Sequence, residues 1–103
     1  MVEIVEDTLK LAKQKFEKFG FKEEQINQLI SSGRKDLEQE IENLKNILQT
    51  TELDTKVLND SLHALKGLLL NMGNNTIADK LIELKNSDDT QLKIEQIKSI
   101  FKF

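Results

Sequence analysis

The sequence predicts an all-α protein, an up-and-down antiparallel four-helix bundle with an additional N-terminal helix. The chain is rich in Leu, Lys, Glu, Gln and Ile and contains no proline, so nothing interrupts a helical run. Apolar residues recur every three or four positions rather than every two. The polar gaps between these periodic stretches are short, which favours antiparallel packing of consecutive helices.

The first periodic stretch predicts an amphipathic helix over about residues 3–19, ending at Gly20, where the left-handed conformation that glycine adopts at no steric cost commonly stops a helix. A second stretch covers residues 22–48 and is interrupted by Ser31-Ser32-Gly33. An interior glycine costs a helix only about 1 kcal/mol. Propensity therefore leaves open whether this helix is broken at Gly33.

The third helix is predicted over residues 57–72, with Thr51 or Asp54 as its N-cap. Gly73-Asn74-Asn75 then ends it. This is the most apolar of the predicted helices.

Two shorter helices close the chain, at about residues 76–86 and 88–103. All five phenylalanines lie near the two ends of the chain, at positions 16, 19, 21, 101 and 103. The first and last helices are therefore expected to share an aromatic contact in the core. The alternative is that residues 100–103 form an exposed apolar end.

Composition restricts the function. A chain of 103 residues is long enough for one domain, so residues 1–103 are expected to form a single unit. Fifteen basic and eighteen acidic residues give a net charge of −3, which disfavours nucleic acid as a partner. With no cysteine and one histidine, a thiolate nucleophile and a structural zinc site are excluded, and no metal or other cofactor is expected.

Other classes are disfavoured by missing signals. No stretch reaches the roughly 18–20 apolar residues of a membrane span, and the first residues do not resemble a signal peptide. A cytoplasmic protein without a membrane partner is expected. No phosphate-binding glycine loop or nucleotide-binding domain is present. The chain is therefore not expected to be a kinase.

The third helix carries the chain's only histidine on its outer side. On a helical wheel at about 100° per residue, with Leu58 at zero, one apolar seam lies within roughly 40° of zero. Its members are Leu58, Leu62, Leu65, Leu69 and Met72. His63 falls near 140° on the same wheel. The seam is expected to face the core and His63 to face outward, where it is either a functional group or an idle surface histidine.

Two neighbours favour a functional His63. Gly67 lies one turn further along the same face and costs the helix about 1 kcal/mol relative to alanine, which a docking surface beside the imidazole would explain. Lys66 lies three residues from His63, close enough for its ammonium group to reach a phosphoryl group on the ring. A tolerated glycine and an ordinary solvated lysine remain the alternatives.

Three further residues are weaker candidates on the rim of this face. Leu70 is an apolar residue directed outward, which is unusual unless a partner or another helix covers it. Asn59 and Asn74 fall near 100° and 160° on the wheel.

The run His63-x-x-Lys66-Gly67, followed after five residues by Gly73, resembles the signature of histidine phosphotransfer domains. The similarity covers about residues 34–86 and includes the apolar positions of the flanking helices. These positions are Leu37, Ile41, Leu44, Leu48, Leu58, Ile77, Ala78, Leu81 and Leu84. The sequence departs from the family at Leu68 and Leu69, where small residues are common.

The resemblance implies a phosphocarrier in a two-component phosphorelay, which is not itself an enzyme and takes no small-molecule substrate. His63 would accept a phosphoryl group and exchange it with the aspartate of a response-regulator receiver domain, and the partners would be that receiver, a hybrid histidine kinase, or both. Lys66 would stabilise the phosphate charge and Gly67 would permit close approach, with Asn59, Leu70 and Asn74 as rim contacts. The alternatives are the phosphoaccepting N-terminal domain of a chemotaxis-type kinase and a non-catalytic helical interaction module.

Overall fold

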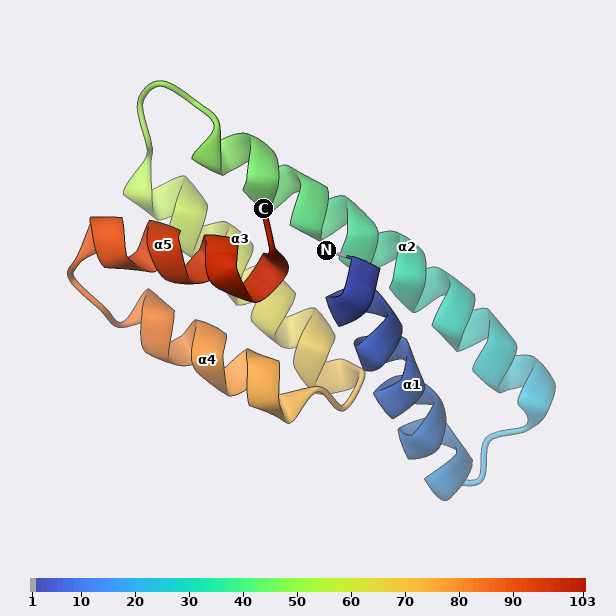
Figure 1. Cartoon of the computed structure of the whole chain (residues 1–103). Helices are drawn as coiled ribbons and strands as arrows, with labels where there is room; N and C mark the ends of the chain where they lie inside the picture. The colour runs from blue at the N-terminus through green and yellow to red at the C-terminus, as the bar shows by residue number, and fades with distance from the viewer. Residues whose placement is uncertain (1) are drawn as a thin grey trace.

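The computed structural model describes residues 2–103, and this part of the chain is all-helical, with no strand. The five helices are α1 (Val2–Lys18), α2 (Glu23–Leu48), α3 (Thr55–Asn71), α4 (Asn75–Lys85) and α5 (Thr90–Phe101) (Figure 1). The prediction of an all-α protein is confirmed. No helix end differs by more than two residues from its predicted position.

Each helix packs against the next one in the chain. The contacts of α3 with α2 and with α4 are the most extensive, and α4 meets α5 only lightly. Helix α1 lies along the first half of α2, and this pair extends beyond the other three helices (Figure 1). The molecule is consequently elongated, with extents of 45 × 21 × 21 Å.

Helix α2 continues without a break through Gly33, which settles the question that propensity left open. The glycine has a packing role there. A Cβ atom at this position would lie only 2.8 Å from Met72 Cε and 3.3 Å from Met72 Sδ. The missing side chain therefore leaves room for the flexible end of the Met72 side chain against α2.

Side chains cap three of the helices at their N-termini. Asp54 Oδ1 accepts hydrogen bonds from the backbone N–H groups of residues 56 and 57, at 3.0 and 3.4 Å, and begins α3. Asn74 Oδ1 and Asp89 Oδ1 do the same for α4 and α5. Each cap satisfies a backbone donor that the helix itself cannot pair. Of the two predicted caps of α3, Asp54 is the one used.

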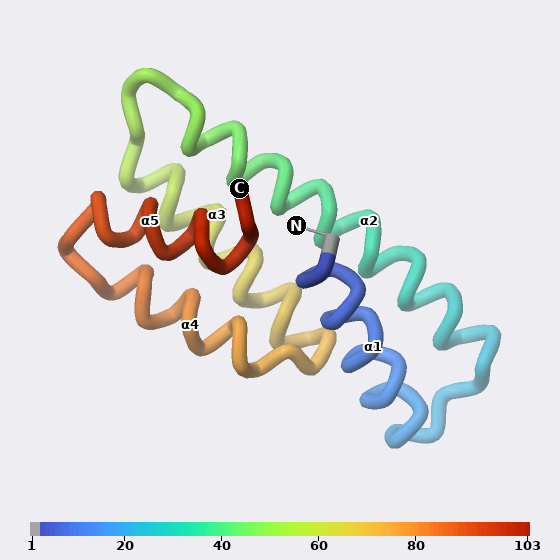
Figure 2. Tube along the Cα trace, in the orientation of Figure 1, coloured from blue at the N-terminus to red at the C-terminus, as the bar shows by residue number. Residues whose placement is uncertain are grey.

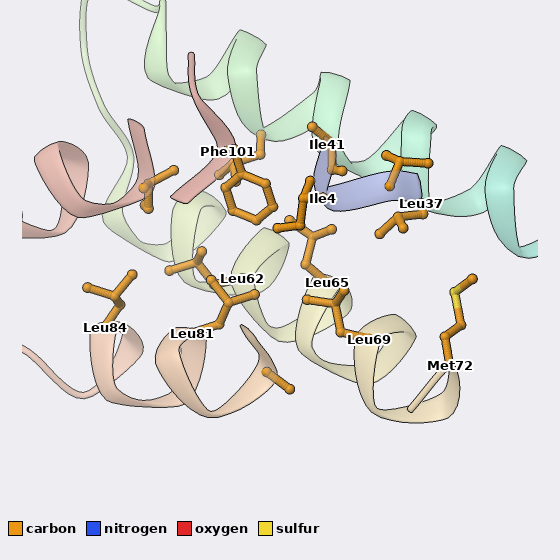
Figure 3. Packing of buried hydrophobic residues seen from close by; sticks show 14 of the residues in the cluster. Ile4, Leu37, Ile41, Leu62, Leu65, Leu69, Met72, Leu81, Leu84 and Phe101 are labelled. Carbon is orange, nitrogen blue, oxygen red and sulfur yellow. The ribbon is translucent and has the colours of Figure 1, made fainter. Parts of the chain in front are cut away.

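One hydrophobic core joins all five helices (Figure 3). The predicted seam of α3 is buried in it: Leu58, Leu62, Leu65 and Leu69 are fully enclosed, and Met72 nearly so. The other helices contribute Ile4, Val5, Leu9, Ala12, Leu37, Ile41, Leu44, Ile47, Ala78, Leu81, Leu84, Ile97 and Phe101. Because the seam faces inward, the opposite side of α3 is fixed as its outer face.

The start of α1 and the last residues of the chain lie close together beside the middle of α2 (Figure 2). Lys102 Nζ forms an ion pair with Glu3 Oε2, and the Phe101 ring lies close to Ile4 and Ile41 in the core (Figure 3). The expected aromatic contact between the first and last helices is not formed. The rings instead pair locally, Phe16 with Phe21 at 5.8 Å and Phe101 with Phe103 at 5.7 Å between centroids.

None of the helices within residues 2–103 combines the length and the apolar character needed to cross a membrane.

Candidate functional site

The outer face of α3 presents His63, as the helical wheel predicts. His63 is exposed, while its neighbours Leu62 and Leu65 are buried in the core. Among the described residues, the imidazole forms no hydrogen bond and no ion pair. Both ring nitrogens are therefore accessible for chemistry or binding.

The helix also fixes which groups surround this imidazole. Side chains on an α-helix lean toward its N-terminus, so the ring of His63 is directed over the turn that contains Asn59 and Asp60. For the same reason, the side chain of Lys66 is directed back toward His63. A group attached to the ring would thus meet an amide and a carboxylate on one side and an ammonium group on the other.

Gly67 lies one turn after His63, in the middle of α3. A Cβ atom built at this position would meet no heavy atom within 4 Å. Unlike Gly33, this glycine is therefore not required by packing within the chain, and its backbone conformation is helical. As a result, no side chain protrudes from the surface of α3 at the position one turn after His63.

Lys66 and Leu70 complete a stripe on the outer face of α3, which consists of Asn59, His63, Lys66, Gly67 and Leu70. Lys66 is half-buried, and its ammonium group has no hydrogen-bond or ion-pair partner within residues 2–103. Leu70 is 37% exposed and lies two turns beyond His63. The stripe thus offers one cation and one apolar contact beside the histidine.

The end of the stripe is held by α1. Lys15 Nζ donates to the carbonyl oxygens of Asn71 at 3.0 Å and Leu70 at 3.4 Å. Both carbonyl groups lie in the last turn of α3; that of Leu70 also accepts from the Gly73 N–H at 3.1 Å. A cation is favourable at this end of a helix. Lys15 therefore fixes the C-terminal turn of α3 against α1.

Asn59 is half-buried at the other end of the stripe, one turn before His63. Its Oδ1 atom accepts a hydrogen bond from Lys93 Nζ of α5 at 3.3 Å. The same ammonium group donates to the carbonyl oxygen of Lys85, also at 3.3 Å. Asn59 is thus tied to α5, while α5 is tied to the last turn of α4.

Asn74 does not lie on the exposed rim, so its predicted placement is wrong. The wheel assumes that α3 continues, but the helix ends at Asn71 and Gly73 turns the chain with a φ of +85°. Asn74 is only 4% exposed. Its Oδ1 caps α4, and its Nδ2 donates to Thr8 Oγ1 at 2.8 Å. The turn therefore uses Asn74 as a structural residue.

Sequence reasoning missed Lys93. This residue is only 3% exposed, which is unusual for a lysine. A signal was available in the pattern, because Lys93, Ile97 and Phe101 follow one another at intervals of four on the buried face of α5. A lysine in the apolar stripe of a helix indicates a buried polar contact, although not the residue that provides it.

No group of three or more histidine, cysteine or carboxylate side chains within residues 2–103 could hold a metal ion. Comparisons with protein-family models, with curated proteins and with solved structures gave no match to this chain. The functional interpretation therefore depends on the arrangement of residues on α3.

Proposed function

We propose that this chain is a histidine phosphotransfer domain, which accepts a phosphoryl group on His63 and exchanges it with the aspartate of a response-regulator receiver domain. In this proposal, α2 to α5 make up the up-and-down four-helix bundle and α1 is the additional N-terminal helix. The chain acts as a phosphocarrier in the cytoplasm and takes its phosphoryl group from a receiver or a hybrid kinase rather than from a nucleotide.

The observation that supports this most strongly is the position of Gly67. A helix-interior glycine costs stability, and here no neighbouring atom requires it. It lies one turn from the exposed, unpaired His63. A flat surface next to a nucleophilic ring is what a docking partner needs if its reacting carboxylate must reach that ring.

The transfer step follows from the chemistry of imidazole. A neutral imidazole has a lone pair on one ring nitrogen, and this lone pair is nucleophilic. The outer ring nitrogen of His63 attacks the phosphorus of an aspartyl phosphate. The new N–P bond forms as the P–O bond breaks, and the aspartate carboxylate leaves with the electron pair. The reverse sequence returns the group to a receiver.

Lys66 and Leu70 have separate roles in this mechanism. A phosphoryl group at the ring brings up to about two negative charges, and the unpaired ammonium group of Lys66 offsets that charge. Leu70 supplies apolar contact area to the partner. Most of the catalytic groups belong to the receiver, because phosphoryl transfer depends mainly on positioning and charge stabilisation.

The test is transfer from phosphorylated receivers. A panel of receiver domains from the source organism is loaded with radiolabelled acetyl phosphate and Mg²⁺, purified, and mixed with the chain. Label is expected to move from at least one receiver to the wild-type chain and not to His63→Gln. Lys66→Ala is expected to slow the transfer, whereas Lys80→Ala, on α4, serves as the matched control. Failure of every receiver to transfer label would favour a non-catalytic interaction module.

A further inference from the structure

Lys93 is a buried cation without a counter-ion. Its residue is 3% exposed, and its ammonium group contacts two neutral acceptors, Asn59 Oδ1 and the Lys85 carbonyl, each at 3.3 Å. Among the described residues, no carboxylate lies within 4.0 Å of it. A buried ammonium group is costly unless its donors are paired. The contacts with Asn59 and with the Lys85 carbonyl therefore offset part of the cost of burying this ammonium group.

This contact determines how the Asn59 amide is turned. An amide has one acceptor oxygen and one donor nitrogen, and Lys93 can only bind the oxygen. The nitrogen, Nδ2, must then point away from Lys93. Nδ2 has no hydrogen-bond partner in the described structure. Within the described residues, every side-chain nitrogen or oxygen atom that is fully buried has a partner, so Nδ2 is not fully buried. The NH₂ group of Asn59 therefore reaches the surface.

Asn59 lies one helical turn before the proposed phosphorylation site. Asn59 and His63 are four residues apart on α3, a spacing that puts their Cβ atoms about 5–6 Å apart. The His63 ring is directed toward the turn of Asn59. A phosphoryl oxygen on that ring is consequently within reach of an amide N–H donor.

We propose that Asn59 donates a hydrogen bond from Nδ2 to the phosphoryl group on His63, and that buried Lys93 is the positioning residue that holds the amide in this orientation. The inference rests on the proposed function, and it assigns a role to α5, which does not carry the histidine. Asn59 and Lys66 then contact the phosphoryl group from opposite ends of the ring.

The alternative is that Lys93 and Asn59 only hold α5 to α3. The variant Asn59→Asp separates the two possibilities. A carboxylate at this position would pair with Lys93 and preserve the tie between the helices, or strengthen it. It would also replace the outward donor with a negatively charged oxygen, which repels a phosphoryl group.

The experiment measures the lifetime of phosphorylated His63 without any receiver. Potassium phosphoramidate phosphorylates imidazole directly: the new N–P bond forms, the P–N bond of the reagent breaks, and ammonia leaves. Because the chain has one histidine, phosphohistidine can form only at His63, and any label that also appears on His63→Gln is discounted. The label is followed by phosphorus NMR after the reagent is removed, and thermal unfolding is recorded for each variant. Asn46→Asp, at an exposed position of α2, adds the same charge elsewhere.

Asn59→Asp is expected to remain as stable to heat as wild type and to shorten the lifetime of the phosphorylated form by about tenfold, the effect of a lost charge-assisted hydrogen bond. Asn46→Asp is expected to leave the lifetime unchanged. A lifetime equal to wild type in a folded Asn59→Asp chain would overturn the proposal.

A second variant covers the case in which Asn59→Asp does not fold. Lys93→Met removes the buried charge and keeps the packing of the side chain, which is often neutral or stabilising. Lys93→Met is expected to shorten the lifetime of phosphorylated His63 about threefold, because the Asn59 amide is then free to turn. In a chain that already carries Asn59→Ala, adding Lys93→Met is expected to leave the lifetime unchanged. If Lys93→Met and Asn59→Ala instead shorten the lifetime independently, so that their effects multiply, the proposal is also overturned. If no receiver transfers its phosphoryl group to the chain, the proposed function is contradicted. The lifetimes can still be compared in that case, because they are measured without a receiver.

Discussion

Asn74 Nδ2 donates a hydrogen bond to Thr8 Oγ1 at 2.8 Å, and both side chains are buried. The bond joins α1 to the turn between α3 and α4, 66 positions apart in the sequence. The same asparagine caps α4 through its Oδ1 atom. One amide therefore fixes the place where the helix of His63 ends.

Replacing this amide should destabilise the fold without affecting the site. Asn74→Ala removes a cap, which contributes about 1 kcal/mol, and a buried hydrogen bond of similar size. We expect a loss of about 2 kcal/mol and a melting temperature lower by roughly 10 °C, measured by circular dichroism. Asn75→Ala, at the exposed next position, should change little. If Asn74→Ala is folded at low temperature and still transfers phosphoryl groups poorly, Asn74 contributes to the site and not only to the fold.

Gly67 offers a substitution in which stability and function should change in opposite directions. Since a Cβ atom there meets nothing within 4 Å, Gly67→Ala should gain about 0.5–1 kcal/mol from helix propensity. Gly67→Gln should be at least as stable as wild type and yet transfer phosphoryl groups at least about tenfold more slowly, because its side chain obstructs docking. The measurements are urea unfolding and transfer from a labelled receiver. Normal transfer in Gly67→Gln would show that the open surface has no role.

Gly33 should behave in the opposite way, because its missing side chain makes room for Met72. Gly33→Val places a stiff, branched side chain against the Met72 thioether, and we expect overpacking to cost about 1 kcal/mol, the low end of its usual range, because Met72 is flexible. Ser32→Val, at the neighbouring exposed position, is the matched control in the same helix. Urea unfolding compares the two variants. Equal stabilities would mean that Met72 moves aside at no cost.

An ion pair between α1 and α2 should make stability depend on pH. Arg34 Nη1 lies 2.6 Å from Glu6 Oε1, and this hydrogen bond lowers the pKa of the Glu6 carboxyl below its ordinary value of 4.5. A lowered folded-state pKa contributes stability that is present above pH 4.5 and is lost as the pH falls through the folded pKa. Glu6→Gln should therefore melt below wild type at pH 7, and the difference should disappear well below pH 4.5.

The matched control for this pair is Glu17→Gln, which removes the longer exposed contact between Lys13 and Glu17 at 4.0 Å. It should show a smaller difference at pH 7. A difference between Glu6→Gln and wild type that persists unchanged into acid would contradict the assigned pKa direction.

Local patterns were sufficient to predict most of the helices and the face of α3. The seam from Leu58 to Met72 is set by helical periodicity, and burial of that seam directs His63 outward. Propensity leaves the continuity of α2 open, and the contact between Gly33 and Met72, 39 positions away, has no signal in the local sequence. Propensity describes the helix alone, whereas this glycine is explained by its neighbour.

The errors at the site have the same origin. Asn74 was placed on a wheel that extends beyond the end of α3, although the left-handed Gly73 redirects the chain there. Lys93 is 34 positions from Asn59, and no periodicity links the two residues. The positions of Asn74 and Lys93 both depend on contacts between helices. Those contacts follow from the packing of α1 and α5 on α3, which the local sequence does not contain.

The most direct test of the central claim is whether His63 carries a transferable phosphoryl group. The wild-type chain is mixed with a receiver that carries a labelled phosphoryl group. One portion of the product is then treated with acid and another with alkali. We expect label that is lost in acid, stable in alkali, returned to an unphosphorylated receiver, and absent from His63→Gln. A chain that is folded and remains unlabelled with every receiver, or a His63→Gln variant that is labelled as well as wild type, would contradict the claim.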